Sequence, residues 1–296
     1  MMKRIRLILH VFVFLALGIT ALNAQNESAV DESNLILDFG AGNQYYNLFN
    51  SGNPNFQGTN FGNFNCGDTF ILNGAQQLTH KCGDHNISSS ELNYRIYQGA
   101  PPAFTPVNIL HNTDLATFNY CTGTSNDQNW QTAAAGIDIL SGLAPGTYNI
   151  EVYTTATYES VIDGNGTHFI SNLGANFIAT FTLIDTTAPT PDAASLSDIL
   201  AECEVTTLTA PTASDNCLGS VTVTNDASLP ISGEGTTTVV TWTYDDGNGN
   251  TSTQLQNVII DDVTAPVADA ASLSDILAEC EVTTLTAPTA SDNCLG

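Results

Sequence analysis

The stretch "YDDGNGNTS", Tyr244 to Ser252, holds two aspartates and two asparagines, whose oxygens are the ligand type that calcium prefers. An EF-hand loop counted from Asp246 needs glycine at its sixth position and glutamate at its twelfth, where this chain has Thr251 and Asn257, so that loop type is excluded. Both flanks are strand-like and Asn-Gly supplies positive φ, which favours a hairpin turn. Calcium on the turn or on a nearby acidic joint is the alternative, with candidate ligands Asp245, Asp246, Asn248, Asp261 and Asp262.

A second group with metal-ligating side chains is "HKCGDH", which holds His80, Cys82, Asp84 and His85. These types could bind zinc or copper, but no second ligand group follows at structural-zinc spacing. His168 is isolated in the sequence, and no serine, histidine and acid set has spacing that suggests a nucleophile. We therefore expect no catalytic residues, no enzyme activity and no required cofactor.

The N-terminus has the form of a secretory signal peptide. Basic residues precede an apolar run from Leu7 to Ile19, and small residues precede Gln25, so cleavage is expected after Ala24. Removal of the leader leaves Lys81 and Arg95 as the basic residues against 30 acidic ones. So acidic a surface excludes nucleic-acid binding and attracts divalent cations. The chain is predicted to be exported to the cell surface or the extracellular space.

The C-terminus repeats an earlier part of the chain. The segment from Asp269 to Gly296 is identical to the segment from Asp192 to Gly219. Identity at a fixed offset indicates a tandem array, and the interval from Asp192 to Asp269 has the length of a small domain rather than of one turn of a solenoid. Because the sequence stops within the second copy, we expect a fragment of a longer repeat protein, with its anchor or any enzyme domain outside it.

Composition and pattern predict an all-β chain. Glycine, threonine and asparagine are frequent, and short apolar runs alternate with polar residues. Tyr148, Ile150 and Val152 alternate with Asn149 and Glu151, as in a sheet with one buried face. Two such sheets packed face to face predict an N-terminal sandwich of the jelly-roll or Greek-key type, followed by Ig-like sandwich repeats. The clearest predicted strands are Thr69–Gly74, Leu92–Gln98, Gly146–Thr155 and Asn176–Ile184, then Ile199–Val205, Ser220–Asn225, Thr236–Tyr244 and Thr253–Ile260.

Threonine- and proline-rich joints, "DTTAPTP" and "DDVTAPV", divide the chain, because proline fixes φ and cannot donate to a ladder. The expected organisation is a signal peptide at 1–24, a linker at 25–33, a sandwich at 34–184, a linker at 185–191, a repeat at 192–262, a linker at 263–268 and a truncated repeat at 269–296.

The segments "PTASDNC" and "TWTYDDGNGN" resemble the hyalin repeat, an Ig-like extracellular module that occurs in tandem in bacterial surface proteins. The resemblance covers residues 189–265 fully and 266–296 in part. Many members place a cysteine in the last strand, where this chain has "STQLQNV". The resemblance implies a spacer or adhesive role without enzymatic activity, and it leaves Cys203 with Cys217 as the natural pair.

Seven cysteines in an exported chain indicate disulfides. Cys203 and Cys217 enclose about 15 residues, a loop whose closure stabilises by about 3 kcal/mol. The second copy would repeat the pair as Cys280 with Cys294. In the first module we expect Cys66 with Cys82, which leaves Cys121 without an assigned partner.

Two functions remain open. The first is a structural or adhesive surface protein with its N-terminal sandwich displayed on tandem spacer repeats, its glycan or protein ligand unknown and no membrane-spanning segment in this fragment. The alternative is the carbohydrate-binding front of a larger secreted hydrolase. In that case Trp130 in "SNDQNWQ" is the candidate stacking platform for a sugar, although a single tryptophan is commonly packed in a core.

Overall fold

The computed structural model of the chain describes residues 27–49, 54–115 and 127–294, and every element in these ranges is a β-strand. The predicted signal peptide lies outside the described residues. The chain divides into two compact units. The first comprises the residues up to Phe64, Asp68–Ser141 and Gly146–Leu183; the second comprises Asn65–Gly67, Gly142–Pro145 and Ile184–Gly296. The all-β prediction is confirmed.

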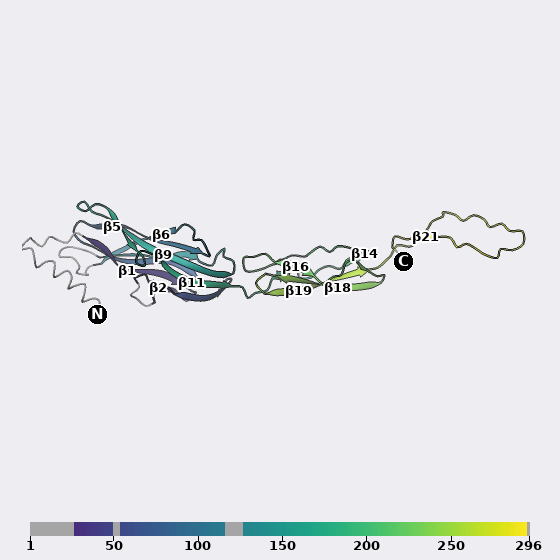
Figure 1. The fold of residues 1–296 in the computed structure, drawn as a ribbon, viewed down its shortest axis with the longest axis horizontal. Coiled ribbons are helices and arrows are strands. Elements are labelled where there is room, and N and C mark those ends of the chain that lie inside the picture. The colour runs from purple at the N-terminus through teal and green to yellow at the C-terminus, as the bar shows by residue number, and fades with distance from the viewer. Residues whose placement is uncertain (1–26, 50–53, 116–126, 295–296) are drawn as a thin grey trace, which may run out of the picture. The chain divides into compact units, whose positions relative to one another are not determined.

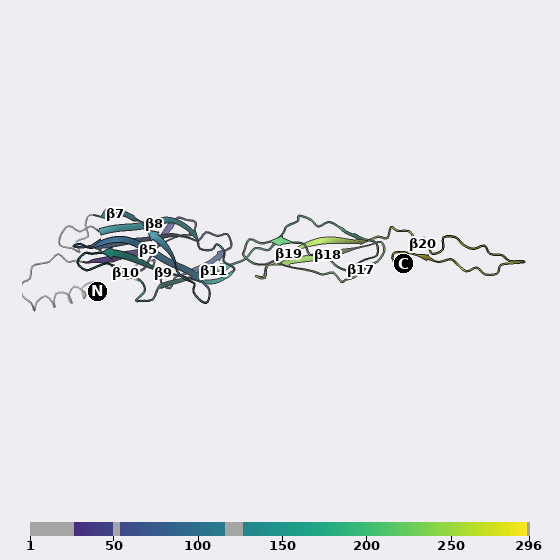
Figure 2. The same ribbon diagram turned by 90° about the horizontal axis from the view of Figure 1, so that it is seen from above.

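The first unit consists of two antiparallel sheets (Figure 1; Figure 2). The chain crosses between the sheets several times, so β4 pairs with β8 in one sheet and β5 pairs with β9 in the other. Such non-consecutive neighbours give a Greek-key sandwich rather than a simple meander. The first sheet has the order β2(Asn43–Asn47), β1(Ser28–Asp38), β4(Ile71–Lys81), β8(Asp127–Asp138), β7(His111–Leu115). The second has the order β3(Asn60–Asn65), β11(Phe177–Ile184), β9(Gly146–Glu159), β5(Asn86–Tyr97), β6(Thr105–Ile109), with β10(Gly166–Ile170) also on β9.

The sandwich core follows the alternation predicted from the sequence. Tyr148, Ile150 and Val152 on β9 are buried, and Phe181 on β11 stacks on Tyr148 with ring centroids 5.5 Å apart. Phe70, just before β4, meets Phe181 edge to face at 5.3 Å and so joins the two sheets. Aromatic pairs of this kind add about 0.5–1.5 kcal/mol to the area they bury.

A polar layer crosses the same core. Ser33 Oγ lies 2.9 Å from Thr154 Oγ1, and Gln77 Nε2 donates to the same Thr154 oxygen at 2.7 Å. Ser90 Oγ donates to Gln77 Oε1. Because these side chains are buried and bonded to one another, the register of β1, β4, β5 and β9 is fixed by hydrogen bonds as well as by packing.

The second unit has a four-stranded sheet with the order β13-β19-β18-β16, in which β18 and β19 form a long hairpin. Two short ladders, β14 with β17 and β12 with β15, complete the repeat. A third ladder, β20 with β21, lies in the C-terminal copy, where the residues are exposed. The bounds are β12(Thr190–Pro191), β13(Ile199–Ala201), β14(Glu204–Val205), β15(Ala213–Ser214), β16(Thr222–Asn225), β17(Ile231–Ser232), β18(Thr236–Asp245), β19(Thr251–Ile260), β20(Val267–Ala268) and β21(Ala290–Ser291).

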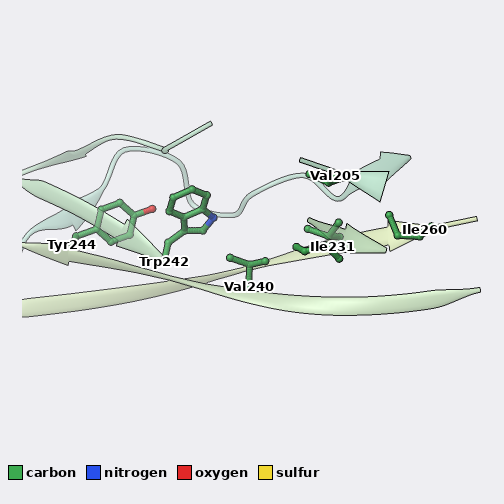
Figure 3. Close-up of a cluster of buried hydrophobic side chains, with 7 residues drawn as sticks. Val205, Ile231, Val240, Trp242, Tyr244 and Ile260 are labelled. Atoms are coloured by element: carbon green, nitrogen blue, oxygen red, sulfur yellow. The ribbon is translucent and has the colours of Figure 1, made fainter. Parts of the chain in front are cut away.

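The core of this repeat is small and alternates along the hairpin (Figure 3). Val240, Trp242 and Tyr244 project from one face of β18, and Val205 and Ile231 from the β14–β17 ladder lie across the core. The polar ends of the rings are satisfied, since Trp242 Nε1 donates to Gln256 at 2.9 Å and Tyr244 Oη donates to Gln254 at 2.8 Å. Two layers around one core make the repeat an Ig-like sandwich.

Candidate functional site

The turn between β18 and β19 is held by its own aspartates. Asp246 Oδ1 accepts the backbone N–H groups of Asn248 at 2.7 Å and Asn250 at 3.1 Å, and its Oδ2 accepts Asn250 Nδ2 at 2.7 Å. Gly247 and Gly249 have φ of 77° and 104°, a region that favours glycine. The predicted hairpin is confirmed, and Asp246 is a buried cap of the turn with 7% of its surface exposed.

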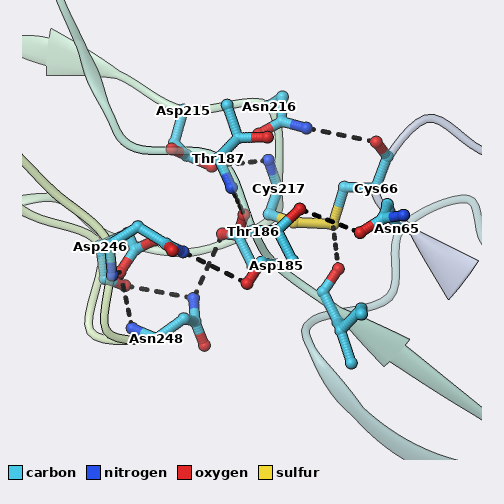
Figure 4. Close-up of a disulfide and its surroundings, with 12 residues drawn as sticks. Asn65, Cys66, Asp185, Thr186, Thr187, Asp215, Asn216, Cys217, Asp246 and Asn248 are labelled. Atoms are coloured by element: carbon cyan, nitrogen blue, oxygen red, sulfur yellow. Dashed lines mark hydrogen bonds between the residues drawn. A yellow bond between two sulfur atoms is a disulfide. The ribbon is translucent and has the colours of Figure 1, made fainter. Parts of the chain in front are cut away.

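The same turn meets the joint ahead of the repeat (Figure 4). Asn248 Nδ2 donates to Asp185 Oδ2 at 3.4 Å, and Asn250 Nδ2 donates to the Asp185 carbonyl at 3.2 Å. Asp215 approaches from the loop after β15, and one ligand atom from each of Asp185, Asp215 and Cys217 lies within 4.8 Å of the other two. These residues, with Asp246 and Asn248, are called the joint cluster below.

The joint cluster concentrates negative charge. Burial, and then the charges of Asp215 and Asp246, raise the pKa of Asp185 although its bond from Thr187 acts the other way. Burial would also raise the pKa of Asp246, but the hydrogen bonds from the turn outweigh it and hold that pKa low. Asp215 Oδ2 is buried and has no hydrogen-bond partner within the described ranges. A cation would stabilise this arrangement.

The five predicted calcium ligands do not come together. Asp245, Asp246 and Asn248 lie at the turn, whereas Asp261 and Asp262 follow β19 at the other end of the hairpin, where Thr236 pairs with Ile260. Ten-residue strands separate the two ends by roughly 30 Å. The sequence analysis missed Asp185 and Asp215. The repeat offset identifies Asp185, because the predicted ligand Asp262 occupies the equivalent position one repeat later. Asp215 has its equivalent in Asp292, which gathers with Asp262 and Cys294 in the structure.

The predicted disulfide pairs are wrong. The structure joins Cys66 to Cys217, with Cα atoms 5.4 Å apart (Figure 4), and it joins Cys203 to Cys294, with Cα atoms 5.1 Å apart. Cys203 lies beside Glu234 and Ile260, while Cys217 lies beside the turn at Asp246, so the two stand at opposite ends of the hairpin. A bridge requires Cα atoms within about 7 Å, which this separation forbids.

The remaining cysteine predictions also change. Cys82 is disulfide-bonded, but not to Cys66, whose partner is Cys217. Cys280 is an exposed free thiol rather than the partner of Cys294. Cys121 lies outside the described residues. Asn216 Nδ2 donates to the Cys66 carbonyl at 3.2 Å, so the Cys66–Cys217 bridge is accompanied by a hydrogen bond.

Trp130 does not offer a sugar platform. The side chain lies on β8 with 6% of its surface exposed, and it packs edge to face on His111 with ring centroids 5.1 Å apart. A stacking platform needs an open ring face. The prediction is therefore wrong, and Trp130 belongs to the packed interior.

The "HKCGDH" side chains divide between two groups in the fold: His80 and Cys82 gather with Glu27, and Asp84 and His85 gather with Asp163, each group with its ligand atoms within 4.8 Å of one another. His80 Nδ1 pairs with Asp31 at 2.9 Å, and this hydrogen bond raises the pKa of His80 against the effect of burial. Cys82 is in a disulfide. His85 instead joins His168, which looked isolated in the sequence, through Ser28, whose Oγ lies 3.0 Å from a ring nitrogen of each. The four residues of this segment therefore do not form one metal site but belong to two separate groups, in one of which Cys82 is held in a disulfide.

Ser28 lies in the middle of a chain of hydrogen bonds that runs from Asp163 through His85 to His168. His85 Nε2 lies 3.1 Å from Asp163 Oδ2, and since a carboxylate only accepts, this nitrogen carries the hydrogen. The Ser28 hydroxyl can then donate to His85 Nδ1 while its oxygen accepts from His168 Nε2. Burial is the largest cause that lowers the pKa of His168, and it favours the neutral form of that residue. The serine oxygen is buried and already bonded on both sides, which fits a structural network rather than a nucleophile.

The outer face of the β9 sheet carries aromatic and charged side chains. Arg95 Nε and Nη2 donate to the two oxygens of Glu151, each at 2.9 Å, and the guanidinium lies over Phe104 with its carbon 4.1 Å from the ring centre. Tyr153 packs between Phe104 and Phe169, with centroids at 4.9 and 6.4 Å. Burial would raise the pKa of Glu151, but bonds from Asn176, Tyr97 and Arg95 outweigh it and lower that pKa.

Comparisons with known proteins are sparse. No family model and no curated protein matches the chain. Among solved structures, the crystal structure of protocadherin gamma C5 EC1-3 is similar over 79% of this chain and 77% of that chain, at 12% identity and a TM-score of 0.25. A likeness at that score carries no weight for function beside the residues of this chain. Within the described ranges, no helix is long and apolar enough to cross a membrane.

Proposed function

We propose that the chain is part of an exported, non-enzymatic bacterial surface protein that displays its first unit on hyalin-type spacer repeats in a structural or adhesive role. One observation carries the proposal: three members of the joint cluster, Asp185, Asp215 and Cys217, recur as a group one repeat later. Asp185, Asp215 and Cys217 gather ahead of one repeat, and the equivalent residues of the next copy, Asp262, Asp292 and Cys294, gather in the same way. Repetition of a joint, with a disulfide at each, supports a role in which the spacing of units matters.

Export and display can be tested on intact source cells. The proposal expects that an antibody against the first unit binds unpermeabilised cells and that external protease removes the signal. Deletion of the gene should reduce attachment of the cells to a surface or to one another. Retention of the protein inside the cell would refute export, and unchanged attachment would refute the adhesive role.

Calcium at the joint cluster is a second part of the proposal. Asp185, Asp215 and Asp246 supply three carboxylates, and the buried Asp215 Oδ2 lacks a hydrogen-bond partner among the described residues. A dedicated site would stabilise the folded chain by about 2.7 kcal/mol at a hundredfold excess of calcium over Kd, and magnesium would not match it. The test is thermal unfolding with calcium, magnesium or EDTA. Loss of the calcium-specific gain in Asp215→Asn supports the site, and equal shifts with both ions would refute it.

Carbohydrate binding by the first unit is the alternative function. The outer face of the β9 sheet favours it, because Tyr153, Phe104 and the 65% exposed Phe169 stand beside the polar groups of Arg95 and Glu151. Aromatic rings beside hydrogen-bonding groups suit sugars. A glycan array should then show binding that is lost in Phe169→Ala and retained in the control Val161→Ala. Absence of binding to every glycan would refute the carbohydrate alternative and leave the structural or adhesive role as the remaining proposal.

A further inference from the structure

The two disulfides of the second unit follow one rule. In each, the later cysteine ends a Ser-Asp-Asn-Cys segment, which is Cys217 in the first copy and Cys294 in the second. The earlier cysteine precedes the copy that contains this segment. Cys294 therefore bonds to Cys203 of the copy before it and not to Cys280 of its own copy. The Cys203 bridge thus joins two copies: it links the first cysteine of the first copy to the Ser-Asp-Asn-Cys segment of the second copy.

The Cys203 bridge is part of a wider contact. Glu202 accepts a hydrogen bond from Asn293 Nδ2, next to Cys294, and its carboxylate oxygens accept Thr264 Oγ1 at 2.9 and 3.0 Å. The Asn293–Cys294 pair lines a pocket together with Glu202, Cys203 and residues of the β17–β18 turn. The first copy thus presents a receiving surface, Glu202 to Glu204, that takes both the asparagine and the cysteine of the segment.

The second copy carries the same three residues, which are exposed in the structure. Glu279, Cys280 and Glu281 are identical to Glu202, Cys203 and Glu204, and Cys280 is an exposed free thiol. We propose that Glu279 to Glu281 receives the Ser-Asp-Asn-Cys segment of the next copy of the repeat and that Cys280 forms a disulfide with its cysteine. The occupied Glu202–Cys203 surface identifies the partner, because the same residues already hold this segment in the structure.

The bond formation needs an oxidant. The two thiols lose two protons and two electrons, and a small disulfide such as oxidised glutathione accepts them and leaves as two thiols. This step rests on the proposed export, which would place the chain in an oxidising compartment. A covalent bond suits this contact, because Glu202, Glu204 and Glu234 surround the pocket and like charges oppose docking by noncovalent contacts alone. Disulfide mapping identifies the partner of Cys280 whatever ligand the first unit binds.

The test lengthens the full chain with its own sequence. Gly296 occupies the position of Gly219, so residues 220–296 can be appended after Gly296 to complete the second copy and begin a third. The copies are identical around these cysteines, so Leu277→Val marks the Cys280 peptide by mass, and the same change at the added copy of Leu295 marks the added peptide. The protein is oxidised with a glutathione buffer, its free thiols are blocked, and it is mapped by mass spectrometry without reduction. The expected result is a peptide that joins Cys280 to the added copy of Cys294, with Cys203–Cys294 retained.

Two controls sharpen the outcome. The unextended chain should show Cys280 blocked as the free thiol. In an extended chain whose added copy of Cys294 is serine, Cys280 should again be blocked, which shows that the pairing needs that cysteine. A bridge between Cys280 and Cys294, a free Cys280 in the extended chain, or a disulfide-linked dimer through Cys280 would each overturn the proposal, the last by placing the partner in another molecule.

Discussion

Replacing Cys66 and Cys217 together with alanine should lower the stability of the chain more than the predicted short-loop pair would have allowed. The bridge joins residues 151 apart, and in the chain-entropy treatment a loop of that size restricts the unfolded state by about 5 kcal/mol, against about 3 kcal/mol for a 15-residue loop. The larger figure is an upper value, since either unit that stays folded already restricts part of the loop. A measured loss of about 3–5 kcal/mol is expected.

Urea unfolding followed by tryptophan fluorescence measures this loss. Trp130 lies in the first unit and Trp242 in the second, and they are the two tryptophans of the chain, so Trp130→Phe and Trp242→Phe backgrounds report each unit separately. The control is replacement of Cys203 and Cys294 with alanine, which should cost less because the residues around Cys294 are exposed and add no core. Unfolding of the Cys66 and Cys217 variant at the wild-type urea midpoint, or a mapped Cys203–Cys217 bridge in the parent, would refute the reasoning.

Three further changes test the packing and the charges. Trp242→Ala should destabilise the second unit by about 3–5 kcal/mol in urea unfolding, because the ring is buried, while the exposed Leu255→Ala should stay within about 0.5 kcal/mol. Gly74→Ala should lower the melting temperature of the first unit, because φ is +122° and the new Cβ would stand 2.2 Å from the Thr132 carbonyl oxygen; an unchanged melting temperature would contradict the local backbone. Since the pKa of His168 is lowered by burial and neighbouring histidine charges, the unfolded chain binds more protons there, so stability should fall as the pH drops below about 6.5. His168→Asn should flatten that fall in melting curves, and an unchanged pH profile would contradict it.

Strand positions with one clearly buried face were predictable. Gly146–Thr155 and Asn176–Ile184 alternate apolar and polar residues, and β9 and β11 form there. β1 and β7 were not predicted, because β1 buries the polar Ser33 within a hydrogen-bonded layer and the edge strand β7 buries little. Alternation marks a strand when one face is apolar, and it fails where the buried groups are polar or the strand lies at an edge.

The joint cluster and the disulfides were less predictable, because both depend on which parts of the chain meet. Cys203 and Cys217 are near in sequence, and loop closure favours near pairs in an unfolded chain. In the folded repeat, the chain between them runs from one end of the β18–β19 hairpin to the other, which places each beside a residue distant in sequence. The repeat offset could have indicated Asp185 as a member of the cluster, because it places Asp185 at the position equivalent to the predicted ligand Asp262.

The placement of the Cys203 bridge between copies has a physical reason in the charge of the chain. The formal net charge is −25, and carboxylates gather at both joints, so contacts there oppose one another unless a cation or a covalent bond compensates. The complete repeat has a core of its own around Trp242 and Tyr244, and a bridge within the repeat would add stability where packing already supplies it. A bridge from Cys203 to Cys294 acts instead at the acidic contact, where noncovalent stabilisation is weakest.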